Sequence, residues 1–259
     1  MSDVILVERD GDIATVVLNR PQKLNALTRP MWKLLGETVD ELSADDSLRC
    51  LVVRGAGDKS FAPGNDISEF ENERSSVEQA RTYGVVHHGA LEALYRCRHP
   101  MLAMIKGICV GGGLEIAGLC DLRICGTSSR FGIPINKLGL TLGPREMRIL
   151  HSLVGKAVTL EILLEGRVFG AEEALAKGLV NRVVADDEVE GEVYATARRI
   201  ADGAPLVARW HKEFMRRLEE PRALGAADEE AAYACYDTED FAIGYQSFLA
   251  KKTPQFRGK

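Results

Sequence analysis

A glycine-rich turn followed by a single acid is the segment of this sequence best suited to chemistry. Gly111, Gly112 and Gly113 come after an apolar run, Met101–Ile105, that predicts a buried strand. Glycine lets the backbone turn sharply, and a turn that opens a helix leaves N–H groups free to hold a negative oxygen. Glu115 lies just inside that helix start among apolar neighbours, where a carboxyl suits general acid or base work. The segment therefore predicts oxyanion stabilisation coupled to proton transfer.

The alternative reading of this segment is a structural strand-to-helix turn that carries a partly exposed glutamate. Two nucleotide-binding readings fit poorly. No Gly-Lys-Ser/Thr follows the glycines, so the turn is not a Walker loop. Asp121 comes too soon after them to reach a ribose in a dinucleotide site.

Composition and charge exclude several classes of protein. The 259 residues carry 33 basic and 38 acidic side chains, a net charge of −5, which gives no basic field for nucleic acid. The apolar runs are too short for a membrane-spanning helix, and the N-terminus lacks the layout of a signal peptide. None of the six cysteines forms a close zinc-type pair, and the five histidines are not spaced as ligands. We expect a cytoplasmic protein with reduced thiols, no metal, no membrane contact and no nucleic-acid partner.

The elements that must position the turn alternate between strands and helices in the first half of the chain. The patterns predict strands at 4–8 and 13–18 joined by a hairpin at Asp10-Gly11, a helix at 29–42 capped by Thr28, a central strand at 50–54, a helix at 77–96 and a strand at 122–125. This order predicts an α/β protein with right-handed crossovers.

The second half of the chain is almost wholly helical in its patterns. We expect helices at 146–154, 156–164, 171–177, 187–202, 206–219 and 237–250, interrupted by a strand at 180–184. The predicted organisation is an α/β body over residues 1–190 followed by a helical region over residues 191–259.

The whole chain resembles the enoyl-CoA hydratase/isomerase (crotonase) superfamily. The resemblance is carried by Leu18-Asn-Arg-Pro21 with Asn25-Ala-Leu27, by Phe61-Ala-Pro-Gly-Asn-Asp-Ile67, by the glycine turn with Cys120-Asp121, by Phe131 with Pro134, and by Gly166-Arg167 through Asn181. Each segment is weak alone, but their order and spacing together are specific. The resemblance implies a crotonase-like spiral of ββα units with a C-terminal helical trimerisation region. It also implies a homotrimer or a homohexamer built as a dimer of trimers.

The same resemblance implies an enzyme that acts on an acyl-CoA thioester, in fatty-acid or related acyl-CoA catabolism. Members stabilise a thioester enolate with two backbone N–H groups, which here fall on Asn65 and Gly112. Glu115 matches a family acid/base residue. No cofactor is implied beyond the coenzyme A that the substrate carries.

The coenzyme A contacts implied by the resemblance fall on two segments and one later residue. They are Lys23, Leu24, Ala62, Gly64, Asp66, Ile67 and Ser68, with Ile135 facing the acyl chain.

The sequence departs from the hydratase pattern at one position that matters for the reaction. Hydratases carry a second glutamate directly after a proline, whereas here Pro134 is followed by Ile135. Adding water to a double bond needs a base for the water and an acid for carbon, and isoleucine can be neither. Three alternatives stay open: Glu146 is a surrogate acid, the reaction is isomerisation or another enolate reaction, or the protein is a non-catalytic acyl-CoA binder. His87 and His88, after the Asn65 segment, either touch substrate or form a plain helix-face pair.

Overall fold

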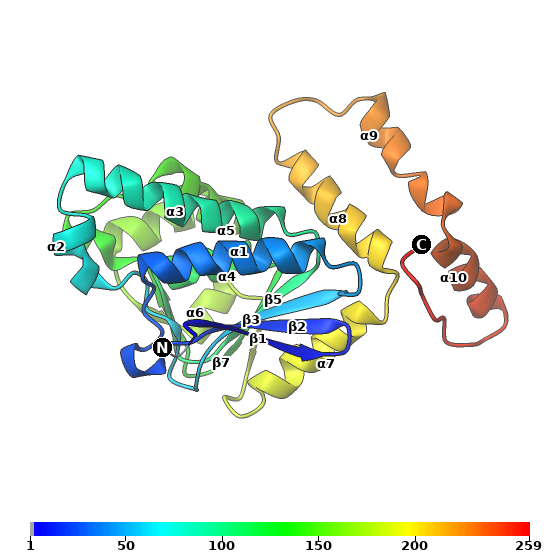
Figure 1. Cartoon of the computed structure of the whole chain (residues 1–259), viewed down its shortest axis with the longest axis horizontal. Coiled ribbons are helices and arrows are strands. Elements are labelled where there is room, and N and C mark those ends of the chain that lie inside the picture. Colours follow the sequence, from blue (N-terminus) through cyan, green and yellow to red (C-terminus); the bar gives the residue numbers. More distant parts are fainter. Residues whose placement is uncertain (1–2) are drawn as a thin grey trace.

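The computed structural model describes residues 3–259 and is built around a six-stranded sheet (Figure 1). The strands run in the order β1-β2-β3-β5-β7-β10, with bounds Ile5–Asp10, Ile13–Leu18, Cys50–Gly55, Met101–Ile105, Leu122–Gly126 and Arg182–Val184. The pair β1 and β2 is an antiparallel hairpin closed by Asp10 opposite Ile13, and every other pair is parallel. The predicted hairpin and the predicted central strand are therefore confirmed.

Helices cover both faces of this sheet. Helices α1 (Arg29–Ala44) and α3 (Val77–Arg96) lie on one face, and α7 (Val189–Ala201) lies on the other (Figure 1). Along β3, Leu51 and Val53 join the core under α1 and α3, while Cys50 and Val52 join the core under α7. This alternation explains why the strand is apolar at every position, since both of its faces are buried.

A second, smaller sheet was not predicted strand by strand. Its four strands are β4 (Ser60–Ala62), β6 (Ile108–Val110), β8 (Arg130–Gly132) and β9 (Phe169–Gly170), in the order β4-β6-β8-β9. A strand of the large sheet, a strand of the small sheet and then helical structure follow one another three times: β3-β4 before α3, β5-β6 before α4 (Gly112–Leu119), and β7-β8 before α5 (Pro144–Glu165). The chain is thus a spiral of ββα units, which confirms the fold implied by the resemblance.

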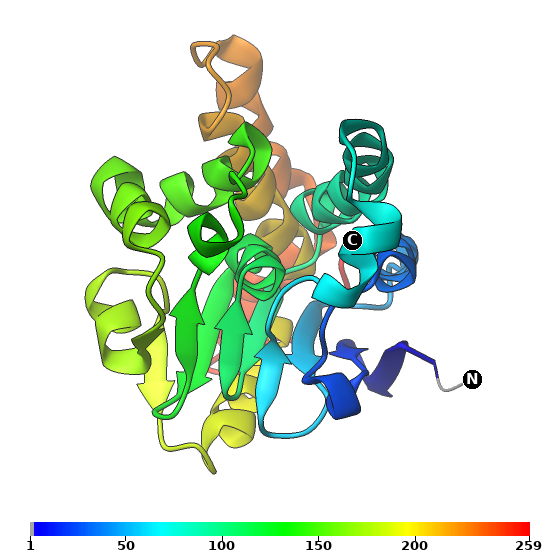
Figure 2. The same ribbon diagram turned by 90° about the vertical axis from the view of Figure 1, so that its left-hand side faces the viewer.

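The helices that follow the small sheet gather on one side of the strands. Figure 2, turned by 90° from Figure 1, shows α3 in teal and α5 in green on that side. Helix α5 is kinked at Gly155, whose φ of 70° and ψ of 177° are not helical. The kink falls where the sequence predicts one helix to end and another to begin. Shorter helical elements are η1 (Pro21–Lys23), η2 (Ile67–Glu69), α2 (Phe70–Glu73), η3 (Pro134–Leu138) and α6 (Ala171–Ala176).

The last quarter of the chain forms an arm of helices that extends from the body (Figure 1). It contains α8 (Pro205–Leu218), α9 (Ala226–Ala231), η4 (Ala234–Asp237) and α10 (Glu239–Leu249). Polar contacts join α8 to the body: Lys212 Nζ donates to the carbonyl of His99 at 2.7 Å and Arg216 donates to that of Tyr95 at 3.1 Å. Helix α7 crosses the predicted boundary at residue 190, and the two-part division stays a prediction. Within residues 3–259, no helix is long and apolar enough to cross a bilayer.

The cysteines lie mainly in the core. All six are free thiols, and five of them are buried. Burial raises the pKa of Cys50 to about 12, so this thiol stays protonated near neutral pH. The placement of five thiols in the core agrees with the prediction from the sequence and gives them a packing role, while their reduced state stays a prediction.

Candidate active site

The loop after β4 and the turn after β6 lie side by side because these two strands are parallel neighbours. Ala62 pairs with Cys109 at the end of β4, so Gly64 comes next to Gly111 and Gly112. A Cβ on Gly64 would lie 3.3 Å from the nitrogen of Gly112, and Gly64 has a φ of +104°. Only glycine suits a position with this conformation and this close approach. The small sheet therefore joins two segments that are more than forty residues apart in the sequence.

At this junction the backbone N–H groups of Asn65 and Gly112 have no protein acceptor among the described residues. The adjacent N–H groups of Gly111 and Asp66 are bonded: Gly111 donates to the carbonyl of Gly132 at 2.9 Å and Asp66 to that of Leu27 at 2.8 Å. Gly112 begins α4, where an N–H has no partner inside the helix. A pair of preorganised donors at a helix start can hold a negatively charged oxygen.

The side chain of Asn65 is held by two buried aromatic residues. Its Oδ1 accepts a hydrogen bond from Trp32 Nε1 at 2.7 Å and another from the Tyr83 hydroxyl at 3.3 Å. Burial raises the pKa of Tyr83, so the hydroxyl keeps its proton and can donate. These contacts fix the peptide that carries the Asn65 N–H. Trp32 was not named from the sequence, because its position on the buried face of α1 is equally typical of a core residue.

Glu115 lies in the first turn of α4 and is almost fully buried. Its sequence neighbours Leu114 and Ile116 are fully buried, and only 7% of Glu115 is exposed. Its Oε2 is 2.8 Å from His87 Nε2. His87, from α3, is also buried, and its ring centroid is 4.4 Å from that of Trp32. The structure thus pairs Glu115 with an imidazole that the sequence could name but not place.

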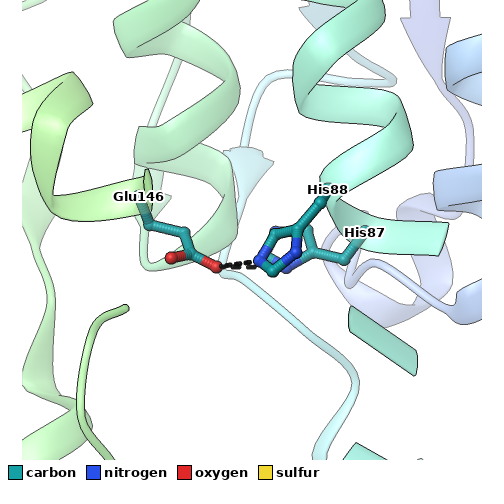
Figure 3. Close-up of side chains that lie close together, drawn as sticks. All are labelled: His87, His88 and Glu146. Atoms are coloured by element: carbon teal, nitrogen blue, oxygen red, sulfur yellow. Dashed lines mark hydrogen bonds and ion pairs between the residues drawn. The ribbon is translucent and has the colours of Figure 1, made fainter. Parts of the chain in front are cut away.

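Glu146 reaches the same histidines from the first turn of α5 (Figure 3). Its Oε1 is 2.6 Å from His88 Nε2 and 3.9 Å from His87 Nδ1. Burial acts to raise the pKa of Glu146, but hydrogen bonds from its own N–H and from His88 outweigh it, so the pKa lies below its ordinary value. Glu146 is therefore a carboxylate near neutral pH. Of the two alternatives for the histidines, an exposed helix-face pair does not fit His87.

Within residues 3–259, the one group of three His, Cys, Asp or Glu side chains close enough to hold a metal ion is formed by His87, His88 and Glu146. One atom from each residue lies within 4.8 Å of the others. His88 and Glu146 are already joined by a short hydrogen bond, so the group is a hydrogen-bonded network as it stands. The absence of a metal from the reaction stays a prediction.

The residues predicted to contact coenzyme A line the segment around Asn65. Asp66 caps η2 by accepting from the N–H of Ser68 at 3.1 Å and pairs with Arg20 at 3.0 Å. Hydrogen bonds from Ser68 and Arg20 lower the pKa of Asp66, although burial opposes them. Ile67 is 51% exposed and Ala62 is fully buried. These residues form a hydrogen-bonded loop, in which Ile67 offers an exposed apolar surface.

Lys23 and Leu24 are exposed at the end of η1, beside the same loop. Leu24 has a left-handed conformation with a φ of 52°. The N–H of Leu27 donates to the carbonyl of Gly64 at 2.9 Å, which ties this segment to the Asn65 loop. The two segments thus form one continuous edge next to the free N–H groups.

Ile135 lies in η3 and packs, half-buried, against the main core. The neighbouring side chain of Asn136 turns away and donates to the carbonyl of Leu164 at 3.0 Å. Position 135 is therefore apolar in the structure, and its contact with an acyl chain stays a prediction.

A large cavity lies between α3, α5 and α8, with a volume of about 1910 Å³. His88 lines it, together with Arg81, Arg145 and Lys212, whereas Asn65, Gly112 and Glu115 do not. His88 is thus the member of the network with Glu146 that reaches this cavity.

Comparison with known proteins finds relatives along the full chain. The model of the family described as enoyl-CoA hydratase/isomerase matches residues 8–259. A short-chain-enoyl-CoA hydratase of Clostridium acetobutylicum is 33% identical over 251 residues, covering 96% of this chain and 95% of the relative. A crotonyl-CoA hydratase of Syntrophomonas wolfei is 31% identical over 258 residues, covering 98% of each chain. The solved structure of an enoyl-CoA hydratase/carnithine racemase from Magnetospirillum magneticum superposes with a TM-score of 0.98 at 48% identity, covering 100% of this chain and 97% of that one.

Proposed function

Because this chain belongs to the enoyl-CoA hydratase/isomerase family, we propose that it adds water to a 2-enoyl-CoA thioester. In this proposal the N–H groups of Asn65 and Gly112 bind the thioester oxygen, and Glu115 is the acid/base residue. The observation that carries it is the junction of two segments: the free N–H of Gly112 and the buried Glu115 share the start of α4, and the segment with the free N–H of Asn65 lies beside it. Two relatives named as hydratases of short enoyl-CoA substrates support the same reaction.

The two donors would act where charge develops. As the oxygen of water bonds to C3, the C2–C3 π electrons move toward the carbonyl and leave an enolate oxygen. An oxyanion held by fixed N–H groups is stabilised most in the transition state, and one such donor contributes about 2.7–4 kcal/mol. Glu115 takes a proton from the water, and C2 takes a proton when the enolate collapses.

The edge formed by Lys23, Leu24 and the Asn65 loop would hold the coenzyme A portion. Exposed Ile67 and Leu24 offer apolar surface to the adenine, and Lys23 offers a cation to phosphate. Gly64, Asp66 and Ser68 shape the loop. The substrate class is then an acyl-CoA of fatty-acid or related catabolism, with no cofactor besides its own coenzyme A.

The test is a direct assay of crotonyl-CoA hydration, followed by loss of the enoyl absorbance. We expect turnover by the purified protein and saturation with crotonyl-CoA. Binding of crotonyl-CoA without turnover would contradict the proposal and favour a non-catalytic acyl-CoA-binding protein. A substitution of Asn25 would be a poor control, because its buried side chain donates hydrogen bonds to the carbonyls of Ala56 and Ser60 and its loss would disturb the fold.

A second candidate, double-bond isomerisation, is favoured by Ile135. An apolar side chain at this position holds no water, so a site with one directly acting carboxyl could move a proton along the acyl chain. We expect 3-hexenoyl-CoA to convert to the 2-enoyl isomer more slowly than crotonyl-CoA is hydrated. If kcat/KM is instead higher for isomerisation of 3-hexenoyl-CoA than for hydration of crotonyl-CoA, isomerisation is the main activity.

We further propose that the C-terminal arm assembles the protein into a trimer or hexamer. Large side chains of the arm are exposed, among them Phe248 at 83% and Tyr236 at 60%. Leu206, Trp210 and Phe214 of α8 are half-buried. Apolar surface of this extent is typical of an interface.

Light scattering should therefore give a mass of three or six times 28.4 kDa at micromolar concentration. Phe248→Asp should lower this mass because it places a charge in the proposed interface, whereas Val77→Asp, at an exposed position of α3, should leave it unchanged. A single-chain mass for the unaltered protein would contradict the assembly.

A further inference from the structure

Four ionisable side chains from three helices lie in a row beside the start of α4. Glu115 of α4 is 2.8 Å from His87, the other ring nitrogen of His87 is 3.9 Å from Glu146 of α5, and Glu146 is 2.6 Å from His88. His87 and His88 are consecutive on α3, and their rings stack with centroids 5.6 Å apart. Figure 3 shows both rings directed toward Glu146. The imidazole of His87 therefore has a carboxyl on each side, Glu115 at Nε2 and Glu146 nearest Nδ1.

Among the described residues, the ionisable side chains that face His87 are Glu115, Glu146 and His88. The ring faces Glu115 from α4, Glu146 from α5 and His88 on its own helix, while α1 contributes the uncharged Trp32. His87 and Glu146 are each about one-tenth exposed, so bulk water has little access to them. An imidazole can accept a proton at one nitrogen while it releases one from the other. Its position between two buried carboxyls suits transfer between them.

We propose that His87 relays a proton between Glu115 and Glu146, and that Glu146, bonded to His88, is the second proton-holding carboxyl of a site that has isoleucine at position 135. This inference rests on the proposed function, because it assigns the second proton-holding group of that same site. It goes beyond a simple replacement of one glutamate by another, since Glu146 would act through His87. His87 is then a positioning and relay residue, and Glu115 alone meets the substrate.

The relay keeps protons and charge in balance. In the resting site Glu115 carries a proton and donates it to Nε2 of His87, whose own proton is on Nδ1. Before water adds, the proton of Glu115 passes to Nε2 and the proton on Nδ1 passes to Glu146, so Glu115 becomes a carboxylate. As the oxygen of water bonds to C3, Glu115 accepts a proton from the water and the enolate forms. Glu115 delivers this proton to C2 as the enolate collapses, and the reverse transfer through His87 returns the proton that Glu146 held. One proton has left the water, one has reached carbon, and the row ends in its starting state.

The gap of 3.9 Å between His87 and Glu146 is longer than a hydrogen bond. Transfer needs the carboxylate or the ring to move by about 1 Å, and catalytic hydrogen bonds often tighten in this way when substrate binds. The kink at Gly155 leaves the first part of α5, which carries Glu146, as a short separate segment.

Two substitutions of His87 separate relay from orientation. His87→Gln keeps an amide near the place of Nε2, which can still hydrogen-bond to Glu115 and orient it, but it cannot pass a proton. His87→Leu removes both roles. The relay predicts that His87→Gln lowers kcat by about 10²-fold with little change in KM, as expected for a lost general acid/base contribution. Full activity in His87→Gln, with loss only in His87→Leu, would reduce His87 to orientation and overturn the relay. His151→Gln, at an exposed position of α5, is the matched control.

Glu146→Gln tests the far end of the row. It keeps the shape of the side chain but cannot take up a proton, so kcat should again fall by about 10²-fold and the pH profile of kcat should change. Glu165→Gln, exposed at the end of the same helix, should leave both unchanged. An unchanged profile in Glu146→Gln would overturn the proposal. Dialysis of the unaltered enzyme against EDTA should also leave kcat unchanged, and a loss restored by Zn²⁺ would replace the relay by a metal site.

A measurement without turnover keeps the relay distinct from the proposed function. Imidazole ¹⁵N NMR, with His87 assigned by its loss in His87→Gln, reports the protonation of its two nitrogens. The relay predicts that Glu115→Gln and Glu146→Gln each shift the titration of His87. If the titration of His87 is the same in both variants as in the unaltered protein, the relay is overturned even when the enzyme is active. If the titration shifts in both variants but the protein fails to hydrate crotonyl-CoA, the relay is kept and hydration is rejected.

Discussion

Glu115→Gln should lower the kcat for crotonyl-CoA hydration by about 10²–10⁴-fold, the usual contribution of a general acid or base. Glutamine keeps the size of the side chain and can still meet His87, so the buried position is filled. It cannot accept the proton of water. KM should change little, because the proposed coenzyme A contacts lie on other residues. Steady-state kinetics with crotonyl-CoA, together with a thermal unfolding curve, measure the effect.

The matched control for this change is Glu172→Gln. Glu172 also lies in the first turn of a helix, α6, but is exposed. Its substitution should leave kcat and the unfolding temperature unchanged. If Glu115→Gln kept the kcat of the unaltered enzyme, the acid/base role of Glu115 would be wrong.

Gly64→Ala should lower kcat by about 10²-fold or more, the cost of displacing one oxyanion donor. The new Cβ would lie 3.3 Å from the nitrogen of Gly112 and 3.3 Å from the carbonyl oxygen of Val110. The φ of +104° is also unfavourable for alanine, so the loop must move and carry the Asn65 N–H with it. Strain of this kind costs on the order of 1–3 kcal/mol in the free energy of unfolding.

Gly57→Ala separates the loss of catalysis from general backbone strain. Gly57 also has a positive φ, +73°, but a Cβ there would meet nothing within 4 Å. This variant should lose some stability and keep its kcat. An equal fall of kcat in Gly57→Ala and Gly64→Ala, or no fall in either, would show that the junction of Gly64 with Gly112 does not hold the reacting oxygen.

The elements of the large sheet could be predicted because each leaves a clear pattern. The helix over residues 77–96 and the strand over residues 101–105 have the predicted bounds, and Thr28 caps α1 by accepting from Met31. The small sheet could not be predicted residue by residue. Its strands have two or three residues each, which is too short to show a period. Helix α9 was missed for a related reason, since six polar and alanine residues carry little apolar pattern.

The candidate site could be predicted in part. The sequence names Asn65, Gly112 and Glu115, and the structure places the first two on adjacent segments with Glu115 in the same helix start. Their roles stay predictions. The pairing of Glu115 with His87, and of Glu146 with His88, could not be read from the chain. Each pair joins two helices, and only the packing of α3 against α4 and α5 determines which ring meets which carboxyl.

The missing second acid shows the limit of a position-by-position comparison. At Pro134 the chain has isoleucine, which by itself argues against hydration. The fold supplies another carboxyl from the first turn of α5, where an acid is also favourable to the helix dipole. The sequence alone leaves these two explanations of Glu146 equal, whereas its contact with His88 and its nearness to His87 favour a role in the site.

A crystal structure with a bound acyl-CoA thioester, such as acetoacetyl-CoA, tests the central claim most directly. The account predicts that the thioester oxygen lies about 2.7–3.1 Å from the backbone nitrogens of both Asn65 and Gly112. It also predicts that the acyl carbons lie next to Glu115. A thioester oxygen bound elsewhere, for example with the acyl chain in the cavity between α3, α5 and α8, would contradict it.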